Sequence, residues 1–188
     1  MRQDFKLRSD AMPSDMQVLL SAYPRDTWEA HPGFKDKTRH WLGAHNMFRQ
    51  LGGILRTETE AYLDKSRDAD DFAAHLSYYG DMMVRNLHGH HGWEDHSYFP
   101  ELAAADPRFE MGLDILENDH QELDVFLERF SKSANRVIQL AELDEKQAYD
   151  ESGGLHDITE TIEAFLQRHL GDEEELAVPI ILHHRLRG

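Results

Sequence analysis

The sequence predicts an all-α protein, an up-down-up-down four-helix bundle with an N-terminal arm. Four long segments carry apolar residues in steps of three and four, which is the spacing of one buried face of an α-helix. No segment of the sequence alternates apolar and polar residues as a half-buried strand does. Short polar stretches separate the four segments, and short connections favour antiparallel neighbours in a bundle.

The chain of 188 residues is long enough for one domain with a full hydrophobic core. We expect residues 1–31 to form an arm and residues 32–188 to form the bundle. The arm should contain one short helix that Ser14 caps and Pro24 ends. The residues expected to pack this short helix are Met16, Val18, Leu19 and Leu20.

The first predicted helix follows Pro32-Gly33 and runs to about Lys65. The second starts near residues 68–71, where acidic side chains suit a helix N-terminus, and ends at a break imposed by Pro100. The apolar stripe of the first helix contains Trp41, Phe48, Leu51, Leu55 and Tyr62, and that of the second contains Leu76, Tyr79, Met83 and Leu87.

The third predicted helix follows Pro107, and the fourth begins at Leu155. We expect a polar connection over residues 144–154, because Gly153-Gly154 is the clearest helix breaker in the chain, and an interruption or kink at Pro179. The stripes contain Leu113, Leu116, Leu123, Leu127, Phe130 and Val137 in the third helix, and Leu155, Ile158, Ile162, Phe165, Leu176 and Ile180 in the fourth.

Histidine and glutamate occupy positions on these stripes where apolar residues are expected. His90 and Glu94 continue the second stripe, and because they are four positions apart their side chains lie side by side on the buried face. Burying both without a partner is costly, and a metal ion is the simplest partner that they could share. The other stripes place His45, His120, His169 and Glu173 in the same way.

The His and Glu pattern occurs twice, which we interpret as an internal repeat. In both copies three residues separate the His from the Glu, and five more separate that Glu from a Pro. The spacing of the helices repeats too, since 45 positions separate His45 from His90 and 49 separate His120 from His169. Four histidines and two carboxylates suit two metal ions with bridging carboxylates and an open position for a small exogenous ligand.

Two further residues are candidates for the metal site. His91 lies beside the stripe, where it could be a ligand or could donate a hydrogen bond to a carboxylate. Glu117 precedes His120 in the Glu-x-x-His pattern of ferritin-like di-iron bundles, although those bundles need the pattern on two helices and it occurs once here. The acidic runs at residues 68–71 and 172–175 are expected to be solvated, with the exception of Glu173.

Composition excludes several classes of function. The chain has 36 Asp and Glu residues against 20 Lys and Arg residues, a formal charge of -16, and no basic stretch that could follow a nucleic-acid backbone. No segment approaches the eighteen or so apolar residues of a membrane span, so we expect a cytoplasmic protein. The absence of Cys excludes disulfides and thiolate zinc sites, which leaves His and carboxylates for metal chemistry. No protein partner can be named.

These residues resemble the hemerythrin-like, or HHE cation-binding, family over roughly residues 36–184. The resemblance rests on the isolated His45, the run from His90 to Phe99-Pro100, the segment Glu117-Asn-Asp-His120, and His169 with Glu173. It implies a four-helix bundle that holds two iron ions in a non-haem, oxo- or hydroxo-bridged centre. The four histidines of the stripes would be terminal ligands, and Glu94 and Glu173 would be bridges. Zinc is the alternative metal.

The chain departs from the family pattern on its third helix. Oxygen-carrying hemerythrins have two histidines one turn apart there, whereas Leu116 and Asp124 lie one turn either side of His120 here. Glu117, His91 or water would have to complete the ligand shell. The resemblance therefore implies a centre that binds or senses oxygen, peroxide or nitric oxide more than one that transports oxygen. The alternatives are a di-iron oxidase or peroxidase-like enzyme, an iron storage or detoxification protein, a mononuclear or dizinc structural site, and a bundle without metal.

Overall fold

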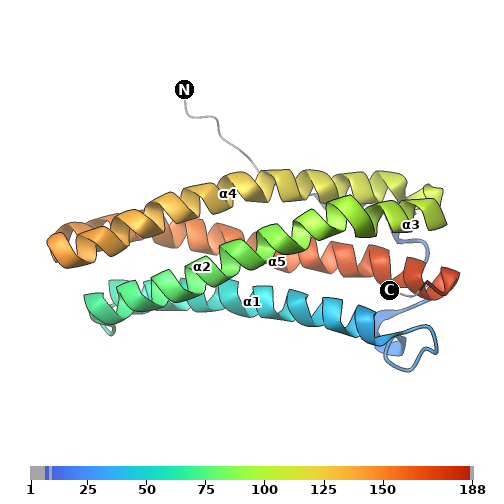
Figure 1. Ribbon diagram of the computed structural model, residues 1–188, viewed down its shortest axis with the longest axis horizontal. Helices are drawn as coiled ribbons and strands as arrows, with labels where there is room; N and C mark the ends of the chain where they lie inside the picture. Colours follow the sequence, from blue (N-terminus) through green and yellow to red (C-terminus); the bar gives the residue numbers. More distant parts are fainter. Residues whose placement is uncertain (1–6, 9, 187–188) are drawn as a thin grey trace. The chain divides into compact units, whose positions relative to one another are not determined.

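The computed structural model describes residues 7–8 and 10–186, which form mainly long α-helices (Figure 1). The long helices are α1 (Asp36–Leu63), α2 (Ala69–Trp93), α4 (Glu110–Leu143) and α5 (Glu145–His184). A π-helical turn, η3 (Glu94–Tyr98), and a short helix, α3 (Phe99–Ala105), follow α2, and a 3₁₀ turn, η4 (Pro107–Phe109), precedes α4. The described residues contain no strand, which confirms the predicted all-α bundle of four long helices. None of the described helices is long and apolar enough to cross a membrane.

The chain forms two compact units. The first comprises the described parts of residues 1–46, 90–122 and 167–188, and the second comprises residues 47–89 and 123–166. Within the second unit, residues 64–68 connect α1 to α2, and Asp144 alone connects α4 to α5. Connections this short place consecutive helices antiparallel, as the up-down-up-down prediction requires.

The predicted stripes form the core of the second unit. At Gly80, a Cβ atom would lie 3.1 Å from the ring of Phe130, so the ring packs directly against the backbone of α2. Residues of all four helical segments are at most 1 % exposed in this core, among them Phe48, Leu55, Phe72, Leu76, Met83, Leu127, Phe130 and Ile162. Periodicity identified these residues with the exception of Phe72, because the buried face of a straight helix repeats every three or four positions.

The N-terminal arm packs into the core of the first unit. Its buried residues Met12, Met16, Leu19 and Trp28 belong to the same hydrophobic cluster as Leu102 of α3, Leu116 of α4 and Leu176 of α5. The arm is therefore part of the packing of this unit.

The arm differs from the predicted single helix. It contains two 3₁₀ turns, η1 (Ser14–Gln17) and η2 (Arg25–Thr27). Ser14 lies inside η1, and the cap position is taken by Pro13, which has no side chain that could accept a hydrogen bond. Val18, which was expected to pack the arm, is 51 % exposed, whereas Met16 and Leu19 are buried three residues apart, as the period of a 3₁₀ turn places them.

The fourth long helix starts ten residues earlier than predicted. Asp144 accepts a hydrogen bond from the backbone N–H of Gln147 at 3.1 Å and so caps α5 at its start. The expected break at Gly153-Gly154 is wrong, since both glycines lie inside the helix. Two glycines cost roughly 2 kcal/mol of helix propensity, and the buried Ala148 and Leu155 on either side offset that cost by packing. The helix also continues through Pro179.

The expected end of the second helix at Pro100 is also wrong. The chain passes from α2 into η3, where the N–H of Phe99 donates to the carbonyl of Glu94, five residues earlier. Pro100 then lies in the first turn of α3. A proline is tolerated there because its missing N–H has no partner to lose.

Asp106, the residue that follows α3, is hydrogen-bonded to His184 in the last turn of α5. Its carboxylate accepts hydrogen bonds from the guanidinium of Arg108 at 2.8 and 2.6 Å, from the backbone N–H of Arg108 at 3.3 Å, and from Nε2 of His184 at 2.8 Å. The Arg108 hydrogen bonds outweigh the opposing effect of burial and hold the pKa of Asp106 well below its usual range. The connection before η4 is therefore held by a carboxylate that must be ionised.

Replacement of Asp106 by Asn should lower the free energy of unfolding by about 1–2 kcal/mol at pH 7, because the charge-assisted hydrogen bonds are lost. A carboxyl whose folded-state pKa is depressed stabilises the fold above its unfolded-state pKa. That contribution is lost as the pH falls below about 4 and towards the folded-state value. Urea denaturation between pH 7 and pH 3 would measure this.

The difference between wild type and Asp106→Asn should therefore shrink as the pH falls. Asp81→Asn is the matched control, since Asp81 pairs with Arg85 on an exposed surface and should change the stability little at any pH. A constant difference between wild type and Asp106→Asn across this range would contradict the assignment.

Candidate metal centre

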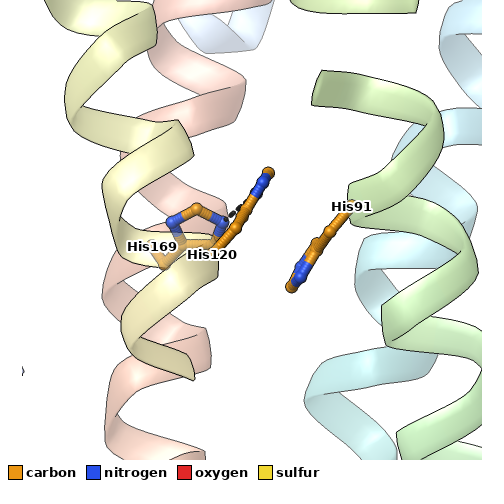
Figure 2. A group of neighbouring side chains, drawn as sticks. All are labelled: His91, His120 and His169. Atoms are coloured by element: carbon orange, nitrogen blue, oxygen red, sulfur yellow. Dashed lines mark hydrogen bonds between the residues drawn. The ribbon is translucent and has the colours of Figure 1, made fainter. Parts of the chain in front are cut away.

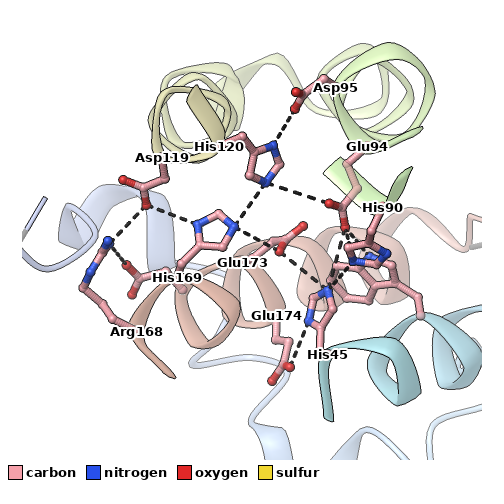
Figure 3. A network of polar contacts seen from close by, with 12 residues as sticks. His45, His90, Glu94, Asp95, Asp119, His120, Arg168, His169, Glu173 and Glu174 are labelled. Atoms are coloured by element: carbon pink, nitrogen blue, oxygen red, sulfur yellow. Dashed lines mark hydrogen bonds and ion pairs between the residues drawn. The ribbon is translucent and has the colours of Figure 1, made fainter. Parts of the chain in front are cut away.

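The six stripe residues expected to bind metal lie together in the first unit (Figure 3). The side chains of His45, Glu94, His169 and Glu173 have no solvent exposure, that of His120 is 2 % exposed, and that of His90 is 10 % exposed. They come from four different helical segments: α1 carries His45, α2 with η3 carries His90 and Glu94, α4 carries His120, and α5 carries His169 and Glu173. The structure thus brings the predicted set into one buried cluster.

The histidines form two pairs. Nε2 of His45 lies 3.0 Å from Nε2 of His90, and Nε2 of His120 lies 3.1 Å from Nε2 of His169. Two imidazole nitrogens that bind one metal at right angles, each at about 2.1 Å, would lie about 3.0 Å apart. The spacing of both pairs fits that arrangement.

The two glutamates each lie near both histidine pairs. Oε1 of Glu94 is 2.9 Å from Nε2 of His90, and its Oε2 is 3.8 Å from Nε2 of His120. Oε2 of Glu173 is 3.6 Å from Nε2 of His45 and 3.7 Å from Nε2 of His169. A carboxylate in such a position can bridge two metal ions.

A further set of carboxylates contacts the outer nitrogens of three of the rings. Nδ1 of His45 lies 3.0 Å from Oε1 of Glu174. Nδ1 of His120 lies 2.7 Å from Oδ1 of Asp95, and Nδ1 of His169 lies 3.2 Å from Oδ2 of Asp119. A neutral imidazole that donates its Nδ1–H carries its lone pair on Nε2. The carboxylates thus set the tautomer that a metal ligand needs.

The facing Nε2 lone pairs of each histidine pair need a positively charged partner between them. Burial lowers the pKa of His169 to about 4, so this ring is neutral near pH 7. A hydrogen bond between the Nε2 atoms of His120 and His169 would require one ring to give up its carboxylate or to become a buried cation. A metal ion between the two nitrogens removes this conflict.

The carboxylates of Glu94 and Glu173 also need a positively charged partner. Oε2 of Glu94 and both oxygens of Glu173 are buried without a hydrogen-bond partner among the described residues. Burial and repulsion from Glu94 raise the pKa of Glu173 well above its usual range. Burial also opposes ionisation of Glu94, but interactions with His45 and His90 outweigh it and hold its pKa low. Two divalent cations would compensate the charge of Glu94 and favour ionisation of Glu173, so these residues fit a dinuclear metal site.

Aromatic side chains enclose one side of the cluster. The indole N–H of Trp41 donates to Oε1 of Glu94 at 2.6 Å and so orients that carboxylate. Tyr98 packs edge-on against Trp41, with ring centroids 5.4 Å apart, and stacks on Trp93, which is 46 % exposed. The hydroxyl of Tyr98 is buried and has no hydrogen-bond partner among the residues that the structure describes.

A pocket of about 690 Å³ borders this aromatic side. Trp41, Trp93 and Tyr98 line it together with Ala44 of α1 and the partly exposed His90. The pocket therefore reaches His90, the more exposed member of the His45 and His90 pair.

His91, one of the two further candidates, stacks on the cluster. Figure 2 shows its ring parallel to that of His120, with centroids 3.9 Å apart and planes inclined by 6°. Its ring nitrogens could form a metal-binding group with those of His120 and His169. The lone pairs of stacked rings lie in parallel planes, however, so His91 and His120 are not aimed at one point as the two pairs are. Neither nitrogen of His91 has a hydrogen-bond partner among the described residues.

Glu117, the other further candidate, is exposed and lies outside the metal-binding groups found among the described residues. Glu174 was expected to be solvated, which is wrong because it is buried against His45. Three further contacts were not predicted from the sequence: Trp41 as a hydrogen-bond donor to Glu94, and Asp95 and Asp119 as partners of His120 and His169. The sequence offered one signal for the carboxylates that contact the histidines, since all three directly adjoin a stripe residue.

Comparison with known proteins agrees with this geometry. The family described as the hemerythrin HHE cation binding domain matches residues 36–181, a range that includes all six residues of the cluster. Searches of curated proteins and of solved structures give no significant match. Because the family match covers most of the chain, the protein belongs to the hemerythrin HHE cation-binding domain family.

Proposed function

We propose that this protein holds two iron ions in the buried cluster and uses them to bind or sense oxygen, peroxide or nitric oxide. The observation that carries the proposal is the convergence of two histidine pairs and two glutamates, each glutamate lying near both pairs. Imidazole and carboxylate together suit iron, and a divalent ion of this class can combine with small exogenous ligands.

Each residue has a distinct role in this proposal. His45 and His90 would hold one ion, His120 and His169 would hold the other, and Glu94 and Glu173 would be shared between the two ions. The protein also excludes bulk water from the centre, since five of the six side chains are at most 2 % exposed. Zinc would satisfy the same donors, so the identity of the metal is part of what must be measured.

A small ligand would approach from the His45 and His90 side. The pocket beside α1 is lined by His90 and by the ring of Tyr98. Burial raises the pKa of Tyr98, and Glu173 and Glu94 raise it further, so the hydroxyl keeps its proton. It is therefore available to donate a hydrogen bond to a small ligand bound within reach.

Replacement of single ligands tests the dinuclear arrangement. His45→Ala should remove one of the two metals, and Glu173→Ala should remove half or more of the metal, because a bridge serves both ions. Elemental analysis after anaerobic reconstitution with ferrous iron gives the metal content per chain. The near-ultraviolet spectrum before and after exposure to air or peroxide reports reaction of the iron.

His88→Ala is the matched control, since His88 is on the same helix as His90 but is exposed and pairs with Asp124. It should keep the wild-type metal content. Unchanged metal in His45→Ala and Glu173→Ala would contradict the proposal, as would many more than two irons per wild-type chain. Sustained consumption of peroxide with a reductant would favour the enzymatic alternative.

Filling the pocket tests the route of the ligand. Ala44→Leu should slow the binding of nitric oxide to the reduced iron protein without changing its metal content, because the larger side chain occupies the pocket beside His90. Stopped-flow absorbance measures the rate. Ala74→Leu fills a different pocket, lined by residues of the second unit, and should leave the rate unchanged. Equal rates in wild type and Ala44→Leu would place the entry elsewhere.

The role of His91 can be decided by a variant that keeps its shape. We expect His91→Phe to retain both metals, because a phenyl ring preserves the stacking on His120 and the stacked geometry does not aim His91 at the histidine pairs. Metal analysis and the optical spectrum provide the measurement. Loss of one metal from this variant would make His91 a ligand.

A further inference from the structure

Two arginines of the N-terminal arm reach the carboxylates that orient metal-ligand histidines. Arg8 binds Asp119, the partner of His169, and Arg25 binds Glu174, the partner of His45. Both arginines precede residue 36, where the match to the family begins. The arm thus contacts the centre from outside the part of the chain that defines the family.

Arg8 holds Asp119 by several hydrogen bonds. Its Nε donates to Oδ1 of Asp119 at 3.0 Å, and its Nη2 donates to Oδ2 at 2.7 Å. The same Nη2 lies 2.7 Å from Oδ2 of Asp172 on α5, and the backbone N–H of Arg8 donates to Glu122 at 3.1 Å. Arg168 adds a contact to Asp119 at 3.1 Å. Arg8 therefore joins α4 and α5 directly behind His169.

Arg25 makes the equivalent contact behind His45. Its Nη1 donates to Oε2 of Glu174 at 2.5 Å, while Oε1 of the same carboxylate lies against His45 Nδ1. The guanidinium of Arg25 also lies over the ring of Trp28, 4.8 Å from its centroid. Because Trp28 is 3 % exposed, the arm positions Arg25 from a buried anchor.

We propose that the N-terminal arm is a clamp that fixes two metal ligands, one in each histidine pair, through Arg8–Asp119–His169 and Arg25–Glu174–His45. Arg8 and Arg25 are positioning residues in this arrangement. The inference rests on the proposed metal site. It adds that metal binding and docking of the arm must favour each other, which the site alone does not require.

The physical basis is the cost of a buried charge. The side chains of Asp119 and Glu174 are only 2 % and 3 % exposed. A buried carboxylate that loses one of its cations is held less firmly and can turn towards water, and it then no longer orients the histidine ring. Coupling between two binding events is reciprocal, so whatever factor the arm adds to metal affinity, the metal adds to arm docking.

Cobalt(II) serves as the probe, because its visible spectrum reports coordination as well as affinity. Chelator competition on the full-length chain should show two binding steps in wild type. Arg8→Ala and Arg25→Ala should each weaken one step by about tenfold, as loss of an outer partner of a ligand does. Arg8→Lys and Arg25→Lys, which keep the charge, should recover part of the loss.

The control is Arg39→Ala. Arg39 also anchors the arm, by an exposed ion pair with Glu29, but contacts no ligand partner. It should leave both cobalt steps unchanged. In the double variant Arg8→Ala/Asp119→Asn, cobalt should bind as in Asp119→Asn alone, because Arg8 acts through Asp119. A role in folding alone would lower the thermal stability of the metal-free protein and leave the cobalt spectrum and affinity as they are.

Hydrogen exchange of residues 14–31 tests the reciprocal effect. Cobalt should slow exchange in wild type and in Arg39→Ala, and should slow it less in Arg8→Ala and Arg25→Ala. If wild type binds no cobalt, the proposed metal site itself fails. If wild type binds two ions while the Arg8 and Arg25 variants bind them equally well or more tightly, or if Arg39→Ala weakens binding as much, the clamp is overturned and the metal site stands.

Discussion

Two pairs of buried imidazole nitrogens face each other across 3.0 and 3.1 Å, with carboxylates between them. In three of the four rings the lone pair on Nε2 is directed inwards because the outer Nδ1–H donates a hydrogen bond to a carboxylate. Without a cation, the facing Nε2 lone pairs and the neighbouring carboxylates would repel one another, because a buried site screens charge poorly. A cation converts the same interaction into a favourable one. Since the proposed ligands come from four helical segments, metal binding at this site would be thermodynamically coupled to folding of the first unit.

The carboxylates that direct the rings follow a regular order around this unit. Asp95, next to Glu94, contacts the histidine of α4; Asp119, on α4, contacts the histidine of α5; and Glu174, on α5, contacts the histidine of α1. Neighbouring residues on a helix point about 100° apart, so a residue adjacent to the buried stripe faces the next helix and not the centre. Three of the four segments thus orient a histidine of another segment, so displacement of one of them would disturb the tautomer of that histidine. In the proposed clamp, a change outside the bundle, such as release of the arm, would act on the metal site through these outer carboxylates.

The sequence was sufficient for the bundle and for the six central residues, because both follow from a helical period that survives folding unchanged. The positions of His45 and Glu173 on apolar stripes also indicated a binding site, since an ionisable group on a buried face needs a partner. Features that depend on contacts between distant segments were not accessible. Glu174 looked like one member of an acidic run, and only the approach of Arg25 and His45 makes it a buried acceptor. The start of α5 was misjudged because Gly153-Gly154 weakens a helix locally, while tertiary packing decides whether it continues.

The π-helical turn at Glu94 explains how one segment supplies so many groups to the centre. In an α-helix, residues five apart point about 140° away from each other, so Phe99 would lie on a different face from Glu94. The wider turn of η3 brings residue 99 back over residue 94, as the hydrogen bond between their backbones shows. Phe99 can then stack on His120 while Tyr98 packs against Trp41, and both rings are buried beside the carboxylate. Pro100 follows in the first turn of α3, so the proline that was expected to end the helix comes directly after the turn in which the helix widens around Glu94.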